Sequence, residues 1–220
     1  MNFSGLISKI TTLLDRSDYD VRAGEFINSA IHELEQTYDW RQMEAAPVTG
    51  NLTTSVDYID IPTRYKNVEC LFITLDTREK PLSKKSYFWL KSRYPSGSNS
   101  KGEPEIFATK TGESKFIIRP YPQKTYAYEL IYNAFSSDLV TDTNESNFWM
   151  SDMWEIVYYG ALVQYELDSG EKLDLKEISE DGTPMNPSKF YNRLLSKLIR
   201  NQIDEEQSNY PLYSVVDWVY

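Results

Sequence analysis

Hydrophobic positions divide the chain into three segments of different periodicity. Before Pro47, apolar residues recur every three or four positions, and this spacing predicts two helices. Asp18 or Asp20 is a suitable N-cap for the second helix. The apolar stripe of the first helix is Phe3, Leu6, Ile7, Ile10, Leu13 and Leu14, and that of the second is Phe26, Ile27, Ala30, Ile31, Leu34 and Tyr38.

Between about Val48 and Phe135 the period changes to two, which is typical of strands with one buried face. Thr111–Ser114 has the composition of a hairpin connection. The sequence therefore predicts a meander of five or six antiparallel strands. The strand candidates are Val56–Pro62, Val68–Leu75, Glu105–Thr109, Lys115–Arg119 and Tyr126–Phe135.

The third segment is helical again. A helix capped by Ser151 and running to about Leu167 has almost no polar face, so we expect it to be buried within the fold or against another subunit. Its candidate subunit-interface residues are Trp154, Tyr158 and Tyr159. Asn186 and Pro187 suit the N-cap and first position of a last helix. The apolar stripe of that helix is Phe190, Tyr191, Leu194, Leu195, Leu198, Ile199 and Ile203.

The last residues, Gln207–Tyr220, are unusual for a chain end because they are rich in Tyr, Val and Trp. Disordered tails are poor in such residues. The order helices, sheet, helices predicts an α+β fold in which residues 1–44 and 147–206 form a four-helix bundle. Residues 45–146 would be an inserted antiparallel β-sheet or sandwich subdomain, and residues 207–220 an extended C-terminal tail.

Composition narrows the class of protein. The 220 residues include 23 Lys and Arg against 33 Asp and Glu, a formal charge of −10. This charge argues against a protein that binds the phosphates of nucleic acids, because such binding depends on Lys and Arg. A single Cys and a single His allow neither an internal disulfide nor a Cys/His zinc cluster. The N-terminus has no basic region before an apolar block, and no apolar run approaches the roughly 20 residues that span a bilayer. We expect a soluble cytoplasmic protein without a membrane segment.

Candidate chemistry is sparse. His32 lacks the second His four positions on that a metalloprotease helix needs, since Gln36 stands there. Cys70 has no neighbouring His in the predicted fold, and we expect it in the core. Asp138, Asp142 and Glu145 lack calcium-loop spacing. The sequence therefore predicts no catalytic residue, no metal site, no cofactor and no enzyme, although a glycosidase-like carboxylate pair stays open among so many acids.

The aromatic residues, 17 Tyr, 9 Phe and 5 Trp, admit two interpretations. Tyr and Trp are enriched at the centres of protein interfaces, and they also stack on sugars. An interface-rich structural protein is the first interpretation. A carbohydrate-binding module is the alternative.

Seven stretches along the chain, taken in order, resemble the phage head-to-tail adaptor (head–tail connector) proteins. The architecture is also similar to the tubular tail protein A of short-tailed phages. The stretches are Phe26–Ile31 with Tyr38–Arg41, Tyr58–Pro62, Lys66–Val68 with Leu71–Ile73, Gly102–Phe107, Phe116–Pro122, Tyr128–Tyr132 and Trp154–Leu167.

The resemblance implies a structural virion protein at the head–tail junction, assembled in the host cytoplasm. It implies a homo-oligomeric ring of about twelve subunits between the portal protein and a tail or nozzle protein, with tail fibres as further partners. Double-stranded DNA would pass through the channel during ejection without specific binding, because acidic walls repel phosphates. The helical bundle would make ring and portal contacts, and the β insertion would face the tail or project outward.

Within this resemblance, the apolar tail suits a segment that orders on docking to the portal or to a neighbouring subunit. The candidate docking residues are Tyr210, Tyr213, Val216, Trp218 and Tyr220. Another tail-completion or baseplate protein remains an alternative, with attachment to tails instead of heads.

Overall fold

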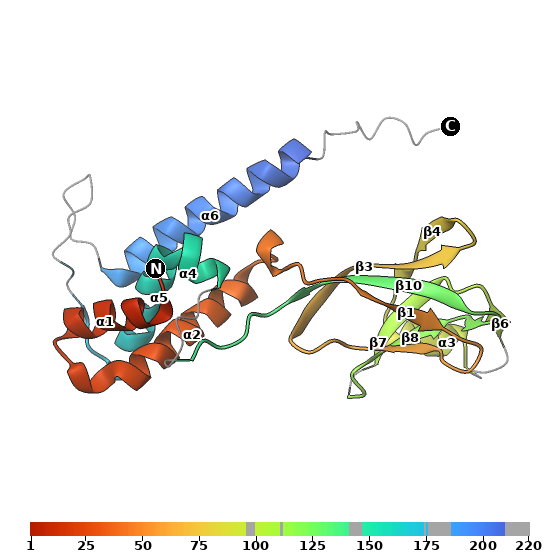
Figure 1. The fold of residues 1–220 in the computed structure, drawn as a ribbon, viewed down its shortest axis with the longest axis horizontal. Helices are drawn as coiled ribbons and strands as arrows, with labels where there is room; N and C mark the ends of the chain where they lie inside the picture. Colours follow the sequence, from red (N-terminus) through yellow and green to blue (C-terminus); the bar gives the residue numbers. More distant parts are fainter. Residues whose placement is uncertain (96–99, 111, 141–146, 174, 176–185, 210–220) are drawn as a thin grey trace. The chain divides into compact units, whose positions relative to one another are not determined.

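The chain folds into two compact units, one mainly helical and one mainly β. The computed structural model describes residues 1–95, 100–110, 112–140, 147–173, 175 and 186–209. Residues 1–42 with 136–220 form the helical unit, and residues 43–135 form the β unit (Figure 1). The α+β class predicted from the sequence is confirmed.

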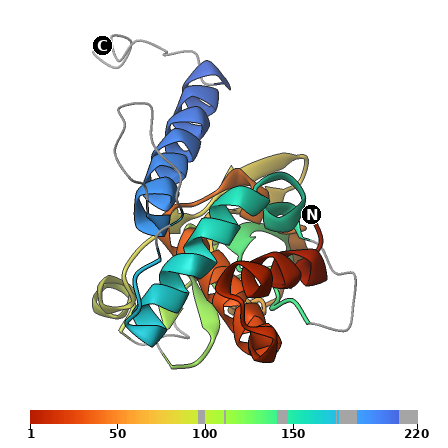
Figure 2. The ribbon, with the colours of Figure 1, turned by 90° about the vertical axis from the view of Figure 1, so that its left-hand side faces the viewer.

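Five helices build the helical unit within the described residues, with a 3₁₀ turn at Ser17–Tyr19 between the first two. They are α1 (Phe3–Leu14), α2 (Asp20–Thr37), α4 (Phe148–Asp152), α5 (Trp154–Ser169) and α6 (Pro187–Asn209). α5 packs against each of the other four, and Figure 2 shows it lying between the α1–α2 pair and α6. The side chains of α5 are buried on several faces because it has neighbours on several sides.

The predicted four-helix bundle with one common core is not shown and stays a prediction. α6 packs against α5, and the described part of its apolar stripe is mostly half-buried, with Ile203 exposed. Because α6 makes its main contact with α5, one side of its stripe stays partly open. The core of this unit therefore lies mainly among α1, α2 and α5.

Local capping explains where these helices begin. Asn186 caps α6 as predicted, its side-chain oxygen accepting the backbone N–H of Lys189 at 3.0 Å. The expected cap of α2 is wrong, since Tyr19 occupies the N-cap without a side-chain bond and Asp18 instead pairs with Arg16. The expected start at Ser151 is also wrong. Asn147 caps the short helix α4, and a break at Met153 precedes α5.

Gly160 lets α5 approach two helices at once. A Cβ at this position would lie 3.0 Å from Ala30 Cβ on α2 and 3.1 Å from Tyr191 Cε2 on α6. We expect Gly160→Val to lower the free energy of unfolding by about 2–3 kcal/mol, because neither neighbour has room to yield. Leu167→Val, a β-branched residue at an exposed position of the same helix, should change it by less than about 0.5 kcal/mol. Urea unfolding of the two variants would check this, and equal stabilities would contradict it.

The β unit contains two four-stranded sheets and the short helix α3 (Tyr87–Arg93). One sheet has the order β1-β10-β3-β4 and the other the order β2-β8-β7-β5, while β6 and β9 pair separately. The strands are β1 (Val48–Leu52), β2 (Tyr58–Asp60), β3 (Tyr65–Leu75), β4 (Arg78–Pro81), β5 (Ser83–Lys84), β6 (Lys101–Gly102), β7 (Ile106–Lys110), β8 (Lys115–Arg119), β9 (Tyr121–Pro122) and β10 (Tyr126–Ala134).

The two sheets share one core, so the unit is a sandwich. Leu71, Ile73 and Leu130 come from the first sheet, and Phe107 and Phe116 from the second. The predicted meander is wrong, because β10 lies between β1 and β3 and so joins strands distant in sequence. The hairpin between β7 and β8 is confirmed, with Lys110 opposite Lys115. Two short pairings, β5 with β7 and β6 with β9, are parallel.

Candidate functional site

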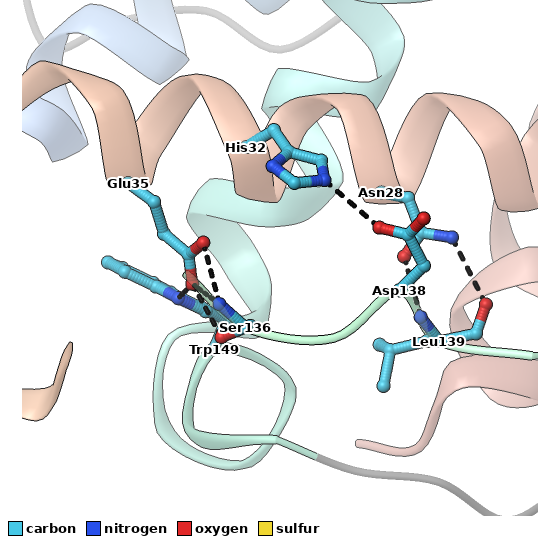
Figure 3. A network of polar contacts seen from close by, with 7 residues as sticks. All are labelled: Asn28, His32, Glu35, Ser136, Asp138, Leu139 and Trp149. Carbon is cyan, nitrogen blue, oxygen red and sulfur yellow. Dashed lines mark hydrogen bonds and ion pairs between the residues drawn. The ribbon is translucent and has the colours of Figure 1, made fainter. Parts of the chain in front are cut away.

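The buried carboxylate of Glu35 on α2 binds the segment that follows the β unit, which begins at Ser136. The side chain of Glu35 is fully buried, and it accepts hydrogen bonds from the Ser136 backbone N–H at 3.0 Å and the Trp149 indole N–H at 2.9 Å (Figure 3). The Ser136 hydroxyl donates to the same carboxylate. These bonds explain why the chain joins the helical unit at Ser136, earlier than residue 147, where the sequence placed the boundary.

One and two turns earlier on α2, His32 and Asn28 hold the same segment. The Asn28 side-chain amide donates to the Leu139 carbonyl at 3.1 Å and accepts the Leu139 N–H at 3.0 Å. His32 Nε2 lies 3.0 Å from an Asp138 carboxylate oxygen, on the surface (Figure 3). Side chains of α2 thus hold residues 136–139 through hydrogen bonds to their backbone and side-chain groups. This arrangement is one of structural support, since every contact named joins groups of the protein to one another.

No metal-binding group emerges among the residues that the structure describes: no cluster of three or more His, Cys, Asp or Glu side chains could hold an ion. Cys70 lies half-buried on β3, on the face opposite Leu71 and Ile73, so the expectation of a core cysteine is wrong. Burial raises the pKa of its thiol, which favours the unreactive protonated form.

A groove lies where the start of α5 meets α6. Its volume is about 410 Å³, and Trp154, Ile156 and Met153 form one wall, with Leu194 and Leu198 from α6 opposite. Lys9 of α1 extends over the Trp154 ring, with its Nζ 4.2 Å from the ring centroid. The groove combines an apolar floor with the charges of Asp152, Glu155 and Lys197 at its rim, a composition typical of protein interfaces.

The three candidate interface residues of α5 lie in different surroundings. Trp154 is half-buried and lines the groove, whereas Tyr158 is buried, with Lys9 Nζ 4.4 Å from its ring centroid. Tyr159 is half-buried and stacks on Phe190 of α6 at 4.7 Å between centroids. Of the three, Trp154 is best placed to meet a partner. The five candidate docking residues of the tail, from Tyr210 to Tyr220, lie outside the described residues.

Tyr191 of α6 sits against this same contact between α5 and α6. Burial and the nearby Glu33 carboxylate raise the pKa of its phenol well above the ordinary value. Its hydroxyl is buried without a hydrogen-bond partner in the described part of the chain. The neutral ring therefore acts as a packing group beside Gly160.

The net charge is divided unevenly between the units. The helical unit has 23 Asp and Glu against 10 Lys and Arg, a formal charge of −13, whereas the β unit has 10 against 13, a formal charge of +3. The charge of −10 for the chain is thus the sum of two units of opposite formal charge. The net charge of the whole chain conceals this division, which a count by segment along the sequence reveals.

An exposed aromatic pair on α3 is a further candidate, and its exposure could not be predicted from the sequence pattern. The side chain of Phe88 is 83% exposed and that of Trp89 41% exposed. Between Glu79 and Glu103 the chain carries six Lys and Arg and no acid, and this run surrounds α3. By contrast, four aromatic residues of the sandwich strands, Phe107, Phe116, Tyr126 and Tyr132, are buried in its core.

A family model described as SU10 adaptor protein matches residues 1–212 of this chain. The chain belongs to the SU10 adaptor protein family. This match confirms the resemblance to phage head–tail adaptors, and it identifies a structural component of the virion that interacts with portal and tail components. Curated proteins give no significant match. The similarity to tubular tail protein A stays a prediction.

As a member of an adaptor family, the protein is expected to act through contact surfaces. Within the described residues, no helix is both long and apolar enough to cross a bilayer. The groove beside Trp154 and the exposed side chains of α3 are two surfaces that the described residues offer for such contacts.

Proposed function

We propose that this adaptor protein is a non-enzymatic ring of about twelve subunits between the portal and the tail, where it extends the DNA channel and gives tail components a place to attach. The family match over residues 1–212 is the observation that carries the proposal. Tail or nozzle proteins would bind beyond the ring, with tail fibres as further partners.

The division of charge supports a channel that does not hold DNA. Duplex DNA adheres to surfaces through Lys and Arg, and its affinity rises with the number of phosphates that they neutralise. A lumen lined by the helical unit, which carries −13, would instead repel the phosphates. The DNA could then slide through the ring during packaging and ejection.

Partner contacts in this proposal fall to two parts of the chain. The tail would bind in a groove, or pair with a strand, of the portal or of a neighbouring subunit. The residues that would make this contact are Tyr210, Tyr213, Val216, Trp218 and Tyr220. Trp154, at the groove between α5 and α6, would lie in a subunit contact together with Tyr158 and Tyr159. Trp and Tyr carry much of the binding energy at protein interfaces.

The proposal predicts that the purified protein co-sediments with DNA-filled, tail-less heads at about one ring per head. Heads made without portal protein are the control, and they should capture none. Binding to isolated tails but not to heads would overturn the proposal in favour of a tail-completion or baseplate protein. Binding to neither would contradict both.

A further inference from the structure

The geometry of α3 points to a contact between copies of this chain. We propose that the basic, aromatic surface around α3 of one copy docks on an acidic surface of the helical unit of the next copy. This inference rests on the proposed ring, and it names the two surfaces that would form the contact between neighbouring subunits.

The α3 surface is held rigidly by the sandwich beneath it. Leu90 is buried against Ile106 and Ala108 of β7, and Tyr87 and Tyr94, one turn before and after it, pack on the same cluster. The helix packs against β7. Because Leu90 faces the sheet, the Phe88 side chain points away from it, and 83% of its surface meets solvent.

Cations surround the exposed rings. Lys85 Nζ lies 5.8 Å from the Trp89 ring centroid, and Lys91 Nζ lies 5.9 Å from that of Tyr87. Trp89 and Arg93 also line an open hollow of about 560 Å³ together with Tyr94, Ile106, Ser92 and one acid, Glu105. The α3 surface thus combines an apolar centre with a positive rim, and its members are Lys84, Lys85, Phe88, Trp89, Lys91 and Arg93.

An acidic surface of matching character lies where the first turn of α2 meets the last turn of α5. The ion pair of Arg22 with Asp168, 3.1 Å long, joins the two turns. Val21 and Leu167, each next to a member of that pair, are 71% and 74% exposed. Residues 15–25 and 166–172 together carry seven Asp and Glu against three Lys and Arg. We call these two stretches the acidic tip.

Charge and exposure favour the acidic tip over DNA as the occupant of the α3 surface. In a duplex the bases are stacked on one another, so an exposed Phe can contact them only by unstacking a base step, which costs free energy. A protein surface with exposed Val and Leu amid carboxylates offers both an apolar and an ionic complement.

The proposed contact joins two different surfaces, so each copy offers one free surface of each kind. Such a head-to-tail contact closes into a ring when the rotation between copies allows it. Since part of the attraction is between exposed charges, self-association should weaken as salt rises.

The first test places a photo-reactive benzoylphenylalanine at position 88 and irradiates the protein bound to DNA-filled heads. The expected crosslinks join position 88 to residues 15–25 or 166–172 of another copy. Crosslinks to DNA, to the portal protein or only to other sites of this chain would overturn the inference. In each of these results the capture by heads would still support the proposed function, so the two can fail separately.

A second test uses two variants with opposite defects, followed by sedimentation velocity. Lys85→Glu with Phe88→Ser removes the α3 surface, and Asp20→Lys with Leu167→Ser removes the acidic tip. All four positions are exposed, so the fold should persist. Each variant alone should self-associate at least about tenfold more weakly than the native chain.

A mixture of the two variants should form a one-to-one dimer, because one intact contact remains between them. Lys124→Glu, the same charge change at an exposed position of the β unit outside the α3 surface, is the control and should assemble like the native chain. Normal assembly of the α3 variant, or a mixture that does not dimerise, would overturn the inference.

Discussion

Replacing Glu35 with Ala should lower the free energy of unfolding of the helical unit by about 3–5 kcal/mol. The carboxylate is fully buried and accepts from the Ser136 backbone, the Ser136 hydroxyl and the Trp149 indole. Its removal leaves these buried donors without an acceptor and opens a cavity. Urea unfolding followed by Trp fluorescence would measure the loss. Faster hydrogen exchange at the Ser136 amide would locate it.

Two further substitutions sharpen this prediction. Glu35→Gln keeps one acceptor oxygen but turns an NH₂ group toward donors, so it should lose about 1–2 kcal/mol. Glu33→Ala is the matched control, since Glu33 lies on the same helix, is exposed and accepts only from Gln164 among the bonds described. It should change stability by less than about 1 kcal/mol. Equal effects at positions 33 and 35 would contradict the role given to the buried carboxylate.

Removing residues 207–220 should weaken capture by DNA-filled heads by at least about tenfold and leave the fold of both units intact. The reason is that the tail is rich in Tyr, Val and Trp side chains, whose burial against a partner would stabilise the complex. Co-sedimentation with tail-less heads would measure the loss, and circular dichroism would check the fold.

Point substitutions separate the proposed anchors from the length of the tail. Changing Tyr213, Val216, Trp218 and Tyr220 together to Ser should reproduce most of the effect of the deletion. Replacing Ser214 and Asp217 with Ala, within the same stretch, should leave capture nearly unchanged. Full capture by the four-fold variant would show that the tail is not the docking segment.

The features confirmed from sequence are those that depend on neighbours along the chain. The cap at Asn186, the spacing of apolar residues in α1 and α2, and the hairpin between β7 and β8 all follow from local preferences. Strand candidates in five places were confirmed for the same reason. The pairing of β10 with β1 and β3 joins residues far apart, and alternation along a strand says nothing about its partners.

In the candidate site, too, some features could be predicted from the sequence and others depend on tertiary contacts. Trp154 could be selected as an interface residue from an apolar helix, but its groove exists only where α6 meets α5. Glu35 resembles any other acid of α2 in the sequence. Its burial depends on Ser136 and Trp149, about one hundred residues away.

By itself, the sequence determined the α+β class, most helices and strands, and the resemblance to phage adaptors, because periodicity, caps and motif order are written along the chain. Only the tertiary structure decided the sandwich pairing, the buried Glu35 network and the way α6 packs. It also decided that Phe88 faces solvent while Leu90 faces the sheet. The physical reason is that the burial of a side chain depends on which elements, distant in sequence, pack over it. The pattern of neighbouring residues does not determine which elements these are.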